Sequence, residues 1–176
     1  MNDHIVLETE RLYLREITFD DAEAMFEMDA DPEVQTFLGK PIAELQQSLD
    51  MIAFIRSQYE ENGVGRWAIV DKVEGRFVGW TGLKLIKDTV NGYSGYYDIG
   101  YRLLRKFWGR GYAFEATKAA VEYGFNVMNL KTMFAIADAN NHASIAILKK
   151  LGFSAENLFL YNERDHYWFS IKRKQP

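Results

Sequence analysis

The chain has 176 residues, a formal charge of −4 and 48% hydrophobic residues. This length and apolar content fit one globular domain, residues 1–176, and exclude an intrinsically disordered chain. Cysteine is absent, which excludes disulfides, a thiol nucleophile and thiolate metal sites. No apolar run reaches the roughly 18 residues of a membrane span. The acidic balance argues against a nucleic-acid partner, so we expect a cytoplasmic protein without membrane or nucleic-acid contacts.

The first half of the chain predicts one strand, two helices and a hairpin. Leu12 and Leu14 alternate with polar residues, as in a half-buried strand. The apolar residues that follow recur at helical spacing until Asn62-Gly63 ends the pattern. The expected elements are a strand at 11–15, helices at 22–28 and 43–60, and a hairpin of 67–70 and 76–80 whose second strand continues to 86.

The second half alternates strands with helices. The expected elements are strands at 96–103 and 132–137, helices at 113–127 and 140–150, and final strands at 157–161 and 166–172. The helix at 113–127 carries small residues along one face: Ala116, Ala120 and Gly124. Such a face lets a helix lie close to a sheet. The whole order, β-α-α-β-β-β-α-β-α-β-β, predicts an α+β domain with helices packed on a mixed sheet.

The strand at 96–103 has two chemically different faces. One face carries Tyr97, Ile99, Tyr101 and Leu103, and the other carries Asp98, Gly100 and Arg102. The first face suits a hydrophobic core, and the second offers charged groups for chemistry or ion pairing.

Two glycines join this strand to the next helix. Gly109 and Gly111 let the backbone curl, and the first turn of the helix adds unpaired N–H groups and the positive end of its dipole. The arrangement suits a phosphate or diphosphate, although a purely structural turn has the same pattern. A kinase-type phosphate loop is excluded because Pro41 follows the single Gly-Lys pair. A dinucleotide fingerprint is disfavoured because Phe114 stands where its third glycine would be.

Five segments in order resemble the GNAT superfamily of N-acetyltransferases, and specifically the branch with the ribosomal-protein N-terminal acetyltransferases. They are residues 9–15 (TERLYLR), 79–83 (GWTGL), 98–101 (DIGY), 108–116 (WGRGYAFEA), and 141–144 (NHAS) with 150–153 (KLGF). The resemblance runs from about residue 7 to 170. It implies the acyl-CoA N-acyltransferase fold, a central mixed and mostly antiparallel sheet flanked by about four helices.

Two positions depart from the superfamily pattern. Trp108 stands where the diphosphate loop usually opens with Gln or Arg, which removes one polar phosphate ligand. Leu148 stands in the helix position where many members have a tyrosine acid. This chain therefore lacks the tyrosine that such members have as the acid at this position.

The resemblance also implies how acetyl-CoA, the co-substrate, would be held. Tyr101, Arg102 and Leu103 would pair their backbone with the pantetheine arm, as an added strand does. The side chain of Asn141 would hydrogen-bond the same arm, and it could cap the helix as well. The diphosphate would be bound through main-chain N–H groups of Gly109, Arg110, Gly111, Tyr112, Ala113 and Phe114.

Acetyl transfer to an amine needs a base for the amine proton and a donor for the departing thiolate. We assign the donor to Ser144, which lies one helical turn after Asn141 and so on the same face. The candidate bases are Asp98 on the central strand and Glu163 near the last strands, and a chain of waters is an equal alternative. Tyr93 and Tyr96 are candidates for the acceptor side.

The sequence thus predicts an acetyl-CoA-dependent N-acetyltransferase in which a primary amine attacks the thioester directly. The acceptor could be a protein N-terminus, a polyamine or another small amine. No metal is expected, because the three histidines lack metal-ligand spacing. Members of the family are often dimers, so a homodimer is a further expectation. The alternatives are a CoA-binding module without catalysis and a nucleotide-binding domain.

Overall fold

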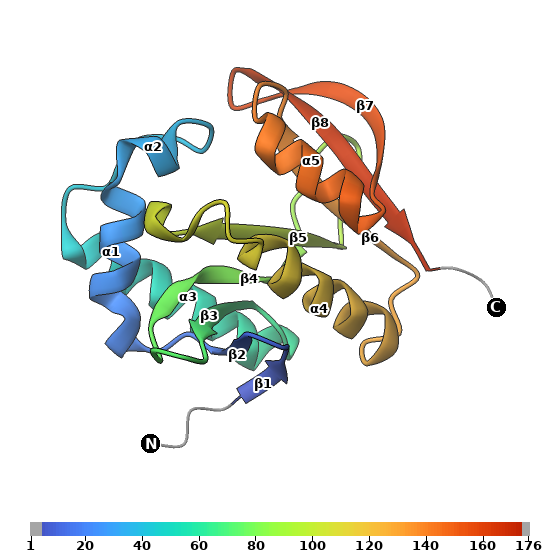
Figure 1. The fold of residues 1–176 in the computed structure, drawn as a ribbon. Helices are drawn as coiled ribbons and strands as arrows, with labels where there is room; N and C mark the ends of the chain where they lie inside the picture. The colour runs from blue at the N-terminus through green and yellow to red at the C-terminus, as the bar shows by residue number, and fades with distance from the viewer. Residues whose placement is uncertain (1–4, 174–176) are drawn as a thin grey trace.

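A computed structural model describes residues 5–173 of the chain. One eight-stranded sheet forms its centre, in the order β1-β2-β3-β4-β5-β6-β8-β7 (Figure 1). The strands are β1 (Ile5–Glu8), β2 (Leu12–Glu16), β3 (Arg66–Asp71), β4 (Phe77–Ile86), β5 (Tyr96–Leu103), β6 (Thr132–Asp138), β7 (Ser154–Tyr161) and β8 (Arg164–Lys172). Neighbouring strands run antiparallel except β5 and β6, which run parallel.

Helices cover both faces of this sheet. They are α1 (Ala22–Ala30), α2 (Pro32–Gln35), α3 (Leu45–Asn62), α4 (Tyr112–Asn126) and α5 (His142–Leu151). On one face, Trp67 of β3 meets Tyr123 of α4 edge-on, with ring centroids 5.1 Å apart. On the other face, Ala68 belongs to an apolar cluster with Met25 of α1 and Ile52 of α3. Helix α5 lies with β7 and β8 at one end of the molecule (Figure 1).

The predicted mixed sheet with packed helices is confirmed, and the unpredicted elements are β1, α2 and two short 3-10 helices at Phe19–Asp21 and Arg105–Phe107. Strand β1 comes from a brief apolar run without alternation and pairs with β2 through an irregular register. Helix α2 has four residues, too few for a helical period. It begins at Pro32, and the carboxylate of Asp31 caps it by accepting from the N–H of Glu33 at 2.9 Å.

The small-residue face of α4 brings this helix close to the sheet. The side chains of Ala116 and Ala120 are fully buried. At Gly124, an added Cβ would lie 2.5 Å from the Sδ of Met133 in β6. The close packing fixes the N-terminus of α4 relative to the end of β5, where the candidate site lies.

The pairing of β4 with β5 yields a first testable prediction. Gly79 lies opposite Leu103 in this register, and a Cβ at Gly79 would meet the backbone of Arg102 and lie 2.7 Å from the Cα of Leu103. Because backbone atoms cannot rotate away, Gly79→Ala should lower the free energy of unfolding by at least about 2 kcal/mol. Urea denaturation measures this change.

Gly75 provides the control for this substitution. It has a φ of 65°, and an added Cβ would have no atom within 4 Å. Gly75→Ala should cost only the conformational penalty of the left-handed region, about 1 kcal/mol. Equal losses in the two variants would contradict the steric account of Gly79.

Candidate active site

The connection from β5 to α4, residues 104–111, forms an open loop with two left-handed glycines, and we call it the glycine loop. Gly109 has a φ of 74° and Gly111 a φ of 79°, and both are exposed. Gly111 is the N-cap of α4, and no side chain caps this end of the helix. The first-turn N–H groups of α4 therefore lack intrahelical acceptors, and the positive end of the helix dipole lies beside them. This geometry suits a diphosphate.

Side chains fix the two ends of this loop. The indole N–H of Trp108 donates to the carbonyl of Leu103 at 3.0 Å, which ties the loop to the end of β5. The hydroxyl of Tyr112 donates to a carboxylate oxygen of Asp71 at 2.8 Å. Trp108, which departs from the superfamily pattern, thus holds the loop in place of offering a polar side chain. The carbonyl of Leu103, a residue whose backbone is predicted to pair with the pantetheine arm, therefore already accepts this hydrogen bond.

The remaining predicted loop residues lie at the surface or close to it. Arg110 is exposed, with its guanidinium over the ring of Phe107 at 5.3 Å. Ala113 and Phe114 are half-buried in the first turn of α4. The ammonium of Lys150 in α5 lies 4.3 Å from the ring centroid of Phe114, so α5 reaches the same end of α4.

The sheet is split beside β5. This strand pairs with β4 along its whole length, from Tyr96 to Leu103, but its register with β6 has a single position, Asp98 opposite Phe134. The edge of β5 that carries Tyr101, Arg102 and Leu103 therefore has no strand neighbour. A strand edge of this kind can pair with an extended ligand through main-chain hydrogen bonds.

Helix α5 begins at the same split. Asn141 caps it, and its side-chain oxygen accepts from the N–H of Ser144 at 3.1 Å. The capping expected from the sequence is confirmed, and the amide nitrogen of Asn141 remains available for a ligand. The hydroxyl of Ser144 lies 2.9 Å from the hydroxyl of Tyr101, which is also 3.0 Å from the carbonyl of Ser144.

The side chain of Tyr101 makes a contact at the candidate site that sequence reasoning missed. It had a role only through its backbone, yet its hydroxyl connects β5 to the first turn of α5. Burial raises the pKa of Tyr101 to about 12, so the hydroxyl keeps its proton at neutral pH. The available signal was alternation, which already placed Tyr101 on one face of the strand with Ile99 and Leu103. Leu148, where many members of the superfamily have an acid, is buried.

The opposite face of β5 carries charged pairs. Asp98 forms an ion pair with Arg66, whose guanidinium also donates to the carbonyl of Asp98 at 2.9 Å. Gly100 leaves room for this arginine, since a Cβ there would lie 2.7 Å from its Nη2 atom. Burial raises the pKa of Asp98, and the charge of Arg66 opposes that shift. Arg102 pairs with Asp29 of α1 at 2.6 Å.

The structure does not place Glu163 in contact with the other predicted residues. It forms the two-residue turn between β7 and β8 with Asn162, and both are exposed with positive φ values, as in a type I′ hairpin. Tyr93 and Tyr96 belong to an aromatic cluster around the buried Trp168. Tyr96 is buried there, while Tyr93 remains about half exposed.

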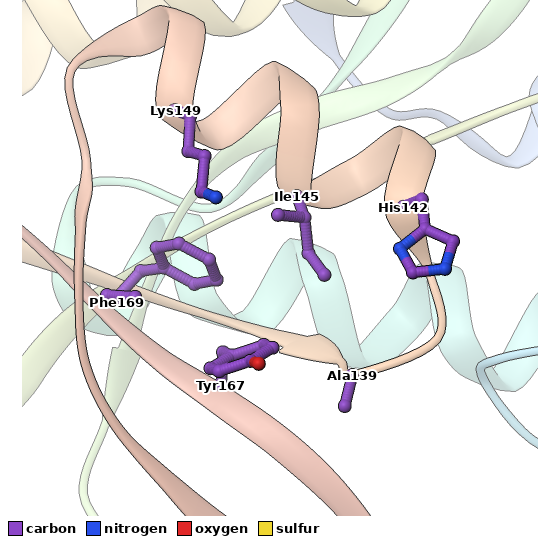
Figure 2. Close-up of a pocket in the computed structure, with 7 residues that line it drawn as sticks. Ala139, His142, Ile145, Lys149, Tyr167 and Phe169 are labelled. Carbon is purple, nitrogen blue, oxygen red and sulfur yellow. The ribbon is translucent and has the colours of Figure 1, made fainter.

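A cavity of about 250 Å³ lies between α5 and the strands β7 and β8 (Figure 2). Its lining residues are Ala139, His142, Ile145, Lys149, Ala155, Tyr167 and Phe169. His142, Ile145 and Lys149 follow one another at helical spacing along α5 and face Tyr167 and Phe169 of β8. None of the predicted site residues lines this cavity.

Two further properties bear on the class of protein. In residues 5–173, no helix is long and apolar enough to cross a bilayer. The same residues hold no group of three histidine or acidic side chains that could bind a metal ion.

The comparison with protein families now adds to this geometry. The model of the acetyltransferase (GNAT) domain matches residues 11–154. The chain belongs to the GNAT family of acetyltransferases. The match includes β5, the glycine loop, α4 and α5, so the candidate site lies inside the family's domain. The chain is accordingly an acyltransferase of the type that uses acetyl-CoA, as the sequence predicted.

Individual relatives match this chain along nearly its whole length. The N-acetyltransferase p20 of Bacillus licheniformis is 34% identical over 176 residues, which cover 96% of this GNAT chain and 97% of p20. Among solved structures, the ribosomal L7/L12 α-N-protein acetyltransferase with coenzyme A has a TM-score of 0.81 at 16% identity, covering 96% and 98% of the two chains. The spermidine N-acetyltransferase from Vibrio cholerae, in complex with CoA and spermine, has a TM-score of 0.73 at 17% identity, covering 93% and 96%. These two likenesses show the fold.

Proposed function

We propose that this GNAT protein transfers the acetyl group of acetyl-CoA to a primary amine by direct attack in a ternary complex. One observation carries the proposal: the unpaired edge of β5 leads through Gly109 and Gly111 to the uncapped N-terminus of α4. An unpaired strand edge followed by a diphosphate site matches the order of groups in coenzyme A, with pantetheine next to the diphosphate.

On the co-substrate side, main-chain groups would supply most of the contacts. The backbone of residues 101–103 would pair with the pantetheine arm, and the amide of Asn141 would bind the same arm from α5. The N–H groups from Gly109 to Phe114 would bind the diphosphate. These contacts would aim the thioester into the split between β5 and β6.

Ser144 and Tyr101 would stabilise the departing thiolate as hydrogen-bond donors. Either hydroxyl can be the donor in the Tyr101–Ser144 contact; the proposal requires the state in which Tyr101 donates to Ser144 Oγ, so that the serine proton can point at the sulfur. Transfer of a proton from a phenol of pKa about 12 to a thiolate whose thiol has a pKa near 8.5 would be uphill by about 5 kcal/mol. The pair therefore acts by hydrogen bonding, and the thiolate takes its proton from solvent.

Asp98 is our candidate for the base. It lies at the single position where β5 still pairs with β6, and so where the split begins. The amine nitrogen forms a bond to the thioester carbonyl carbon, the carbon–sulfur bond breaks, and the amine proton passes to the Asp98 carboxylate, directly or through water. Its raised pKa makes Asp98 a stronger base than an exposed aspartate. Glu163 remains the second candidate.

Thiol release from acetyl-CoA tests this function. The purified protein is assayed with N-terminal peptides, polyamines and other small amines, and the acetylated product is identified by mass spectrometry. We expect amine-dependent thiol release with at least one of these classes. Binding of acetyl-CoA without thiol release for any of them would contradict the proposal. A cytoplasmic location and a homodimer stay predictions.

The thiolate donor can be tested separately. Ser144→Ala and Tyr101→Phe should each lower kcat about tenfold with little change in acetyl-CoA affinity, because each removes a hydrogen bond that strengthens as the sulfur gains charge. Since the two hydroxyls act in series, the double variant should be hardly worse than either single one. Steady-state kinetics measures both effects. Additive losses would contradict the serial arrangement, and unchanged rates would remove the pair from the mechanism.

A further inference from the structure

The turn between β1 and β2 reaches across to the glycine loop. The guanidinium of Arg11 donates to the carbonyl of Arg110 at 2.9 Å and to a carboxylate oxygen of Glu115 at 2.6 Å. The other carboxylate oxygen of Glu115 accepts from the main-chain N–H of Arg11 at 2.9 Å and from the Thr9 hydroxyl at 2.7 Å. The same guanidinium lies 4.6 Å from the ring centroid of Tyr112. Neither Arg11 nor Glu115 has a role in the function proposed above.

The bond to Arg110 fixes the direction of a peptide group. In a trans peptide, the carbonyl of one residue and the N–H of the next point in opposite directions. Because Arg11 holds the carbonyl of Arg110, the N–H of Gly111 points away from Arg11. Glycine at 111 would otherwise let this peptide rotate, and rotation would present a carbonyl oxygen to the bound anion.

The ion pair of Arg11 with Glu115 neutralises a carboxylate that has the same sign of charge as the diphosphate. Glu115 lies in the first turn of α4, close to the N–H groups that would bind the diphosphate. Burial alone would raise the pKa of Glu115, but the hydrogen bonds from Thr9 and Arg11 outweigh it and lower the pKa. The carboxylate is therefore charged at neutral pH. Without Arg11, its charge would repel a diphosphate at the same helix end.

We propose that Arg11 is a positioning residue of the diphosphate site, holding the Arg110–Gly111 peptide with its N–H outward and cancelling the charge of Glu115. The inference rests on the proposed use of acetyl-CoA. It extends the site to a turn that lies about 100 residues earlier in the chain.

Arg11→Gln tests this role with two ligands that differ in the diphosphate. Calorimetry measures the Kd of CoA, and kinetics measures KM and kcat for acetyl-CoA and for acetyl-pantetheine, which lacks the diphosphate. We expect CoA affinity to fall about tenfold and the KM for acetyl-CoA to rise similarly. The kcat, and the KM for acetyl-pantetheine, should stay unchanged. Arg11→Lys keeps the charge but not the forked contact, and should recover part of the loss.

Lys72 gives a matched control. Its ammonium binds Glu8 at 2.6 Å and the carbonyl of Thr9, so it supports the same turn without contacting the glycine loop. Lys72→Gln should leave CoA affinity unchanged. In the double variant Arg11→Gln with Glu115→Gln, removal of the repelling charge should restore part of the affinity lost in Arg11→Gln.

The outcomes separate this inference from the proposed function. If the wild-type protein fails to bind CoA, the proposed function is wrong. If the wild type binds CoA and Arg11→Gln binds it equally well, the role of Arg11 alone is wrong. A parallel loss for acetyl-pantetheine would also overturn the role, since it would mean general structural damage. Arg11 lies at the surface, with 44% of its side chain accessible, so we expect both Arg11 variants to fold.

Discussion

Gly111→Asp is expected to lower the affinity for acetyl-CoA about 100-fold, equivalent to about 2.7 kcal/mol. The new carboxylate would lie at the N-cap of α4, where it would compete with the diphosphate for the same N–H groups and repel its charge. The fold should tolerate the change, because aspartate adopts left-handed φ values more readily than most residues. An added Cβ would meet only Arg11, with its Nη2 atom 3.4 Å away.

Gly111→Asn is the matched control for this charge. Asparagine has the same shape and the same tolerance of left-handed φ, but it is neutral. We expect it to lose about tenfold in affinity or less. Calorimetry with CoA measures both variants, and thermal unfolding shows that they fold. If aspartate and asparagine weaken binding equally, the charge of the diphosphate is not what this loop recognises.

Asp98→Asn is expected to lower kcat/KM several-hundred-fold at neutral pH, within the usual contribution of a general base. Burial raises the pKa of Asp98 above its ordinary value. The ionised form is the base, so the wild-type rate should rise with pH as the carboxyl loses its proton. Asparagine cannot accept the proton, and this acidic limb of the pH–rate profile should disappear. A profile of unchanged shape would contradict the assignment.

Two controls accompany the pH profile. Asp98→Asn leaves Arg66 without its ion-pair partner, so thermal unfolding and CoA affinity must be measured to separate lost stability from lost catalysis. Glu163→Gln changes the exposed alternative at the β7–β8 turn. It should leave the profile intact. Loss of the acidic limb in this variant would transfer the role of base to Glu163.

Local patterns were enough to predict most of the fold. Alternation along residues 96–103 separated the face of Ile99 from that of Asp98, and the small residues of α4 indicated its close approach to the sheet. The glycine loop could also be predicted, because backbone positions with a left-handed φ are usually occupied by glycine. Elements of four residues, such as α2, carry too few positions to show a period.

Contacts between distant parts of the chain could not be predicted in the same way. The pairs Tyr101–Ser144, Arg66–Asp98 and Arg11–Glu115 join residues 43, 32 and 104 positions apart. Each depends on the register of strands and on how α4 and α5 sit on them, which no local period encodes. In the proposed mechanism, these pairs decide the hydrogen-bond donor to the thiolate, the protonation state of the candidate base and the shape of the loop that would bind the diphosphate.

A crystal structure with bound CoA tests the central claim most directly. We predict that the diphosphate lies within hydrogen-bonding distance of main-chain N–H groups between Gly109 and Phe114. The pantetheine arm should run along the free edge of β5, with its sulfur near Ser144. A diphosphate bound elsewhere, with the glycine loop empty, would contradict the account.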